Sequence, residues 1–228
     1  MREWNQGRTS EYPRTTARRS VFGIALVLSA AVFSKSPPPN VDESMGASEA
    51  SWRAVSKPAE EMTMGHLHIQ FEQTTLSDVL NAINLGAIQQ QGDAAEHVLW
   101  LCYTVRAEGD NARVWIESSG EMGGPEHSVT QIAARRISNK DSPSDCPTLP
   151  KRFEPLSFGH GLWLGASEAT VRKTFPVGLV GDAEHLFIGY QTKVSGDCDD
   201  GFDLLNSLSL TFRAGLLDAI EAGQGTSC

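Results

Sequence analysis

The expected architecture follows from one segment, Gly161-Leu-Trp-Leu-Gly-Ala-Ser-Glu-Ala-Thr-Val-Arg-Lys-Thr-Phe-Pro176. Its first residues alternate in polarity like the end of a strand, and Gly165 supplies the backbone freedom needed to reverse direction. Ser167 stands at the N-cap of a helix, where its hydroxyl accepts an amide hydrogen of the first turn. Val171 and Phe175 then share one face, and the closing proline ends the helix. A helix this short needs a sheet to pack on.

The residues after this helix predict that sheet. Segments 185–193 and 205–213 are strand candidates, and in the second of them Leu and Phe alternate with Ser and Thr. Ala214-Gly215 indicates a turn, after which 216–221 returns as a third strand. We therefore expect one helix followed by an antiparallel meander.

The preceding residues repeat this order. Segment 66–72 alternates as a strand, and Thr75-Leu-Ser-Asp78 matches a capping box that opens a helix. The apolar run 97–105 predicts a central strand, followed by a hairpin turn and an antiparallel partner over 112–117. Segment 129–137 fits either a strand or a helix, and its Val and Thr favour the strand.

The fold class predicted from these elements is α+β, with two halves that each hold a short helix and an antiparallel meander. Ala95-Glu-His97 and Ala183-Glu-His185 open corresponding strands, which leaves open both a tandem duplication and two meanders that merely look alike. The predicted organisation is an export signal over 1–34, a flexible spacer over 35–62, a first half over 63–146 and a second half over 147–228.

The composition is that of an ordinary globular protein, because 40% of the 228 residues are hydrophobic and 21% are charged. The formal net charge is −9. Nucleic acids and anionic lipid surfaces are bound by clustered Lys and Arg, so the acidic balance argues against both as partners.

The N-terminus has the pattern of an export signal. Arg14, Arg18 and Arg19 precede the apolar run 21–33, and Ser29-Ala-Ala31 offers small residues for cleavage. The run is shorter than the ~20 apolar residues that a transmembrane helix needs. We predict an exported protein, periplasmic or secreted, with anchoring by an uncleaved N-terminal segment as the alternative.

The cysteine count fits that location. Four cysteines in an exported chain suggest two disulfides, for which three connectivities exist. We favour Cys102–Cys146 and Cys198–Cys228, one in each half, and four unpaired thiols are the alternative. No pair of cysteines has the spacing of zinc ligands, so no metal site is predicted.

The segment Leu164-Gly-Ala-Ser-Glu-Ala-Thr-Val171, closed by Phe175-Pro176, resembles the helix-entry motif of the small outer-membrane-assembly lipoproteins of the BamE/SmpA type. A tandem pair of such units is similar to the β-lactamase inhibitory proteins, which pack two helix-plus-sheet repeats into one concave surface. The resemblance implies a strand, a turn and a capped helix. It transfers no binding residue, and the lipid-attachment cysteine of the lipoproteins is absent after the apolar run.

The glycine-rich segment 118–127 holds the best candidate site. Glu121, Glu126 and His127 could act there as acid, base or metal ligand, because glycines let a ligand approach the backbone. A strained hairpin between two strands explains the same glycines.

The tryptophans also allow two interpretations. Trp52, Trp100, Trp115 and Trp163 could form a platform for carbohydrate or peptide, or they could pack in the core. Three of the four lie in apolar strand patterns, which favours the core.

The preferred functional hypothesis is an exported, disulfide-bonded protein without catalytic activity. It would bind a protein or cell-envelope partner of unknown identity through sheet and loop surfaces. The sequence carries no convergent catalytic set and no cofactor motif. The alternative hypothesis is a metal-dependent or acid–base hydrolase that uses the segment 118–127.

Overall fold

The computed structural model describes residues 36–39, 54–92, 97–107, 110–119, 126–138, 146–196 and 201–227. In chain order its elements are β1 (Glu61–Met64), β2 (Leu67–Gln70), α1 (Leu76–Ile83), β3 (Gln89–Gln91), β4 (Val98–Ala107), β5 (Asp110–Ser119), β6 (Gln131–Ile137), β7 (Leu156–Phe158), α2 (Glu168–Thr174), β8 (Val180–Gly181), β9 (His185–Val194), β10 (Phe202–Arg213) and β11 (Leu216–Ser227). Short 3-10 helices lie at Lys151–Phe153 and Gly159–Gly161.

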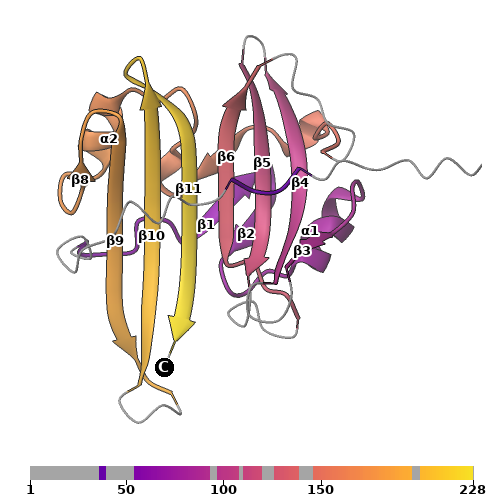
Figure 1. The fold of residues 1–228 in the computed structure, drawn as a ribbon, viewed down its shortest axis with the longest axis horizontal. Helices are drawn as coiled ribbons and strands as arrows, with labels where there is room; N and C mark the ends of the chain where they lie inside the picture. The colour runs from indigo at the N-terminus through magenta and orange to yellow at the C-terminus, as the bar shows by residue number, and fades with distance from the viewer. Residues whose placement is uncertain are drawn as a thin grey trace, which may run out of the picture. The chain divides into compact units, whose positions relative to one another are not determined.

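The large sheet contains eight strands in the order β3-β4-β5-β6-β11-β10-β9-β8 (Figure 1). All neighbouring strands in it are antiparallel. Each half of the chain contributes a three-stranded meander, β4-β5-β6 and β9-β10-β11. The meanders meet along β6 and β11, where the pairing runs from Gln131↔Gly223 to Arg135↔Ala219. The sheet is therefore continuous across both halves.

A small sheet, β2-β1-β7, lies behind the large one in Figure 1. In it, β1 from the first half pairs with β7 from the second, from Met62↔Phe158 to Met64↔Leu156. Apolar side chains of both sheets and both helices form the main core. Its largest fully buried side chains are Tyr103, Phe71, Phe153, Phe158, Met62, Met64, Ile69, Leu76, Ile83, Leu101 and Ile116.

The predicted α+β class is wrong, because the structure is essentially all-β. Of the residues described, 52% lie in strands and 14% in helices. Helix caps are strong local signals in a sequence, yet α1 and α2 have only 8 and 7 residues and form no layer of their own. The strands reach 12 residues in β10 and β11. The two meanders merge into one sheet instead of standing as two helix-plus-sheet halves.

The helix starts agree with the sequence. Thr75 and Asp78 form the predicted capping box, in which each side chain accepts a hydrogen bond from the backbone amide of the other. The Asp78 carboxylate accepts hydrogen bonds from the backbone amide and the side chain of Thr75, and these two bonds lower the pKa of Asp78. Ser167 caps α2, where its hydroxyl accepts from the Thr170 amide at 3.2 Å. Val171 is buried in the main core, so α2 packs on the sheet as expected.

The predicted strands of both meanders are confirmed, and segment 129–137 is a strand from Gln131 onward. Part of the predicted spacer 35–62 packs on the fold, since the Ala54 amide donates to the Gly189 carbonyl at 2.9 Å and Ala59 is buried. The predicted export signal 1–34 lies outside the described residues. Within the described ranges, no helix is both long and apolar enough to cross a membrane.

Candidate functional site

The large sheet has two different faces. Side chains alternate along β4, so Leu101 and Tyr103 enter the main core, whereas Trp100 and Cys102 point to the opposite side. We call this opposite side the open face; Figure 1 views the sheet from it, with β1 and β2 behind. The register places on it Trp100, Cys102, Trp115, Glu117, Gln131, Ala133, Arg135, Ala219, Glu221, Gly223, Ser207, Ser209 and Phe187.

The first half of the open face carries an apolar cluster of its own, separate from the main core. It consists of Trp100, Cys102, Trp115, Ala133 and Cys146. All five are buried: the exposed fraction is highest for Trp115, at 4%, and is 0% for Trp100. The predicted disulfide Cys102–Cys146 is present and ties the segment before β7 to the sheet. The other predicted disulfide, Cys198–Cys228, lies outside the described residues.

A short proline segment lies against this cluster. The indole Nε1 of Trp115 donates a hydrogen bond to the Ser36 carbonyl oxygen at 3.2 Å, although the two residues are 79 positions apart. Ser36, Pro38 and Pro39 are half-buried and Pro37 is exposed. Figure 1 shows this indigo segment crossing in front of β6 and β5. Ser36, which belongs to the predicted flexible spacer, thus contacts Trp115.

Two carboxyl groups lie on the open face beside this cluster. Glu117 on β5 pairs with Trp100 on one side and Gln131 on the other, and Glu221 on β11 pairs with Ala133. Burial, and then the charge of Glu221, raise the pKa of Glu117 to about 8. Burial also raises the pKa of Glu221 to about 7, although the positive charge of Arg135 opposes this rise.

The surroundings of these acids contain polar atoms without hydrogen bonds. Glu117 Oε1 and Trp100 Nε1 are buried and have no hydrogen-bond partner within the part of the chain that the structure describes. An ionised carboxylate in such a place is costly. Glu117 is therefore protonated near neutral pH, in agreement with its raised pKa.

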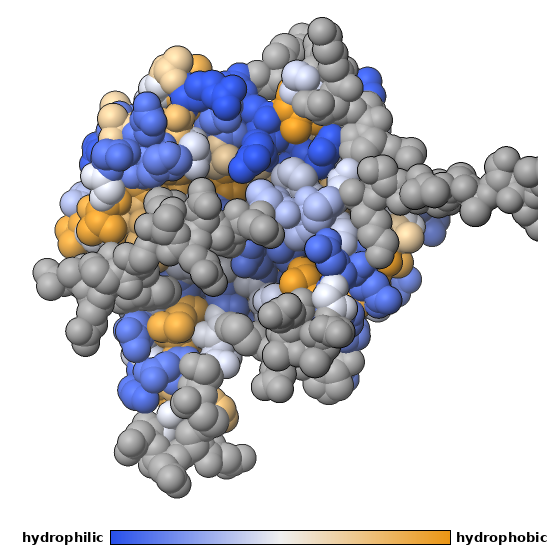
Figure 2. All heavy atoms as spheres, viewed as in Figure 1, coloured by the Kyte–Doolittle hydropathy of each residue, from blue (hydrophilic) through white to orange (hydrophobic). Residues whose placement is uncertain are grey.

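The second half of the open face is a floor of small and polar side chains. Ser207, Ser209 and Gly223 are half-buried there, and Phe187 lies beside Ser209 in the register. The coloured parts of this side in Figure 2 include both hydrophilic and hydrophobic residues. Small side chains keep the sheet backbone close to the surface, which suits contact with another chain.

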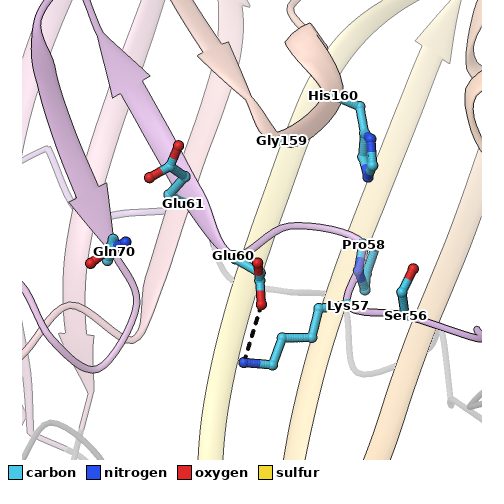
Figure 3. Close-up of a pocket in the computed structure, with 8 residues that line it drawn as sticks. All are labelled: Ser56, Lys57, Pro58, Glu60, Glu61, Gln70, Gly159 and His160. Carbon is cyan, nitrogen blue, oxygen red and sulfur yellow. Dashed lines mark ion pairs between the residues drawn. The ribbon is translucent and has the colours of Figure 1, made fainter.

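A polar pocket of about 390 Å³ lies on the side of the small sheet, where the segment 56–60 faces the turn at Gly159 (Figure 3). His160 points toward Pro58 in this view. Beside the pocket, Lys57 forms an ion pair with Glu60 at 3.5 Å, and Glu61 Oε1 lies 3.3 Å from His68 Nδ1. The pocket is lined by Ser56, Lys57, Pro58, Glu60, Glu61, Gln70, Gly159 and His160.

The residues predicted as a site are not brought together by the structure. Glu126 is exposed, and His127 is half-buried with a left-handed backbone at φ 55°. The ring of His127 meets that of His97 edge to face, with centroids 6.4 Å apart. Glu121 lies outside the described residues. Among the residues described, no three His, Cys, Asp or Glu side chains form a group that could hold a metal ion.

Sequence reasoning missed the acids and the proline contact. Glu117 alternates with Val114 and Ile116, so the pattern marks it as an ordinary outward-facing residue of a strand. The burial of Glu117 depends on Trp100 of β4 and on β11, which the fold brings next to it from other parts of the chain. The favoured core packing of the tryptophans is confirmed for Trp100 and Trp115, which are buried in an apolar cluster separate from the main core. Trp163 packs half-buried against the main core, and Trp52 lies outside the described residues.

Comparison with protein-family models, with curated proteins and with solved structures found no match. The resemblance of the helix entry to the outer-membrane-assembly lipoproteins stays a prediction. The candidate site is therefore defined by geometry alone: an antiparallel sheet whose open face holds a tryptophan cluster, an acid pair and a polar floor.

Proposed function

We propose that this chain is an exported, disulfide-bonded binding protein without catalytic activity, and that the open face is its ligand surface. The observation that carries the proposal is the tryptophan cluster outside the main core, because Trp115 already holds a distant chain segment there through its indole. Tryptophan combines a large apolar area with one hydrogen-bond donor, and it is enriched where proteins bind one another.

The polar floor supports the same function. A protein interface has an apolar centre surrounded by polar, hydrogen-bonding groups. On the open face, the cluster around Trp115 would be the centre, and Ser207 and Ser209 would belong to the surround. The net charge of −9 favours a partner with a complementary basic surface. A protein or another component of the cell envelope fits this description.

Export is supported by the basic and apolar pattern of residues 1–34 and by the disulfide Cys102–Cys146, since disulfides persist outside the cytosol. The mass of the protein recovered from its native source tests this part. A mature chain that begins after the small residues Ser29-Ala-Ala31 is the expected result. An intact Met1 would contradict cleavage and favour the anchored alternative.

Partner binding is tested by capture from envelope and extracellular extracts with two matched variants. Ser209→Arg places a large cation on the open face, whereas Ala169→Arg places the same cation on the exposed side of α2. We expect a captured partner to be lost with Ser209→Arg and kept with Ala169→Arg. A partner that both variants retain equally, or the absence of any partner under all conditions, would contradict the proposal.

A further inference from the structure

The contact between Trp115 and Ser36 has the chemistry by which proteins recognise proline-rich peptides. Consecutive prolines adopt the extended polyproline II helix, which makes no internal hydrogen bonds and leaves its carbonyl oxygens free. Grooves lined by aromatic side chains bind such segments by packing on the rings and donating to those oxygens. Here the Trp115 indole of the cluster donates to the Ser36 carbonyl oxygen at 3.2 Å, and the run Pro37-Pro-Pro39 follows directly after Ser36.

The position of this segment gives a second reason to regard it as a ligand. Pro38 and Pro39 are half-buried and Pro37 is exposed, as expected for an extended segment with one side on a surface. The segment belongs to none of the strands or helices of the fold. The hydrogen bond from Trp115 joins it to the open face.

The cluster also has a donor that the segment does not use. The indole nitrogen of Trp100 is buried and has no hydrogen-bond partner among the described residues. Beside the cluster, the Arg113 guanidinium lies over the Trp115 ring at 5.7 Å from its centroid and fixes one face of that ring. A buried donor next to a fixed aromatic ring suits a ligand backbone rich in acceptor oxygens.

We propose that the tryptophan cluster of the open face is a recognition site for an extended, proline-rich peptide, and that residues Ser36–Pro39 occupy this site in cis. The inference rests on the proposed binding function, for which it names the chemistry of the partner. The partner segment displaces Ser36–Pro39 and takes over the hydrogen bond from Trp115.

A tethered occupant weakens the binding of an external one. A segment that belongs to the same chain competes with a free peptide at an effective concentration of up to about the millimolar range. The wild-type chain should therefore bind a free proline-rich peptide more weakly than a variant whose own segment has been weakened. This difference separates occupation in cis from a simple lack of affinity.

The test uses the full chain with the combined substitutions Pro37→Gly, Pro38→Gly and Pro39→Gly. The probe is a fluorescent peptide with the sequence of residues 34–42, which contains the three prolines. We expect the glycine variant to bind the probe about tenfold more tightly than the wild type in fluorescence polarisation. Its tryptophan emission should shift to longer wavelength and return when the peptide is added.

A second substitution tests the indole. Trp115→Phe in the glycine variant keeps an aromatic ring and removes the donor, which should weaken peptide binding about threefold to tenfold. Trp163→Phe is the matched control, because Trp163 is half-buried against the main core, where its ring stacks on Phe158 with centroids 6.1 Å apart. Circular dichroism confirms that each variant is folded before binding is measured.

The proposal is overturned if the folded glycine variant does not bind the probe. It is also overturned if Trp115→Phe leaves the affinity unchanged, or if a peptide with serine in place of the three prolines binds equally well. If any of these occurs while Ser209→Arg still abolishes partner capture, the open face remains a binding surface and only its specificity for proline-rich peptides is refuted.

Discussion

The acid pair predicts an unusual dependence of stability on pH, which Glu117→Gln should remove. In the folded chain the pKa of Glu117 is raised from its ordinary 4.5 to about 8. Between these two values the folded state binds more protons than the unfolded state. The free energy of unfolding therefore falls as the pH rises through this window, and the contribution is greatest below the ordinary pKa.

The magnitude follows from the shift. Each pKa unit corresponds to about 1.4 kcal/mol, so full ionisation of Glu117 in the folded chain costs roughly 4–5 kcal/mol as an upper bound. Relaxation and water entry reduce this cost, and we expect a loss of about 2–4 kcal/mol between about pH 5 and about pH 9. Glu221 adds to the fall in the same direction, because its pKa is raised to about 7.

The assay is urea unfolding followed by tryptophan fluorescence at about pH 5, 7 and 9. Glu117→Gln keeps the shape and removes the ionisation, so the variant should match the wild type near pH 5 and exceed it near pH 9 by about 2–4 kcal/mol. Glu126→Gln is the control, since it removes an exposed carboxylate and should leave the pH profile as it is. Equal pH profiles for the wild type and Glu117→Gln would refute the reasoning.

Three further predictions concern stability. Thr75→Ala removes the capping box of α1 and should lower the free energy of unfolding by about 1 kcal/mol in urea titrations; an unchanged midpoint would contradict the cap. Replacing Cys102 and Cys146 by Ala removes a cross-link between residues 44 positions apart and should cost about 4 kcal/mol relative to the oxidised wild type in the same unfolding curves. The reduced wild type should show a similar loss, and an oxidised wild type no more stable than the variant would contradict the prediction. Gly65→Ala puts a Cβ 2.5 Å from a backbone carbonyl at φ +61°, whereas Gly215→Ala at φ +74° meets nothing within 4 Å. Thermal melts should therefore show a much larger loss for Gly65→Ala, and equal losses would argue against the close contact.

The sequence predicted those elements whose signals are local. The side chains of Thr75 and Ser167 cap helices within three residues of themselves, and Leu208, Leu210 and Phe212 alternate within one strand. Such patterns need no knowledge of distant partners. The predicted α+β class was wrong because the two clearly capped helices are short, whereas most of the described residues with regular secondary structure lie in strands.

The pairings between distant segments could not be read from the chain. Nothing local indicates that β6 pairs with β11 or that β1 pairs with β7, because both pairings join one half of the chain to the other. The candidate site depends on such pairings. Glu117 is buried next to Trp100 and lies close enough to Glu221 for that charge to raise its pKa. Trp115 forms its hydrogen bond with Ser36, which lies 79 positions away in the sequence.

The join between β6 and β11 has a mechanical consequence. Among the described residues, five residue pairs from Gln131↔Gly223 to Arg135↔Ala219 join β6 to β11, and Glu117 and Glu221 belong to strands from opposite halves of the chain. A load that separated β6 from β11 would expose both carboxyl groups to water. The pKa values of both carboxyl groups would then fall toward their ordinary range. Separation of β6 from β11 would therefore release protons near neutral pH and make the protein more negative.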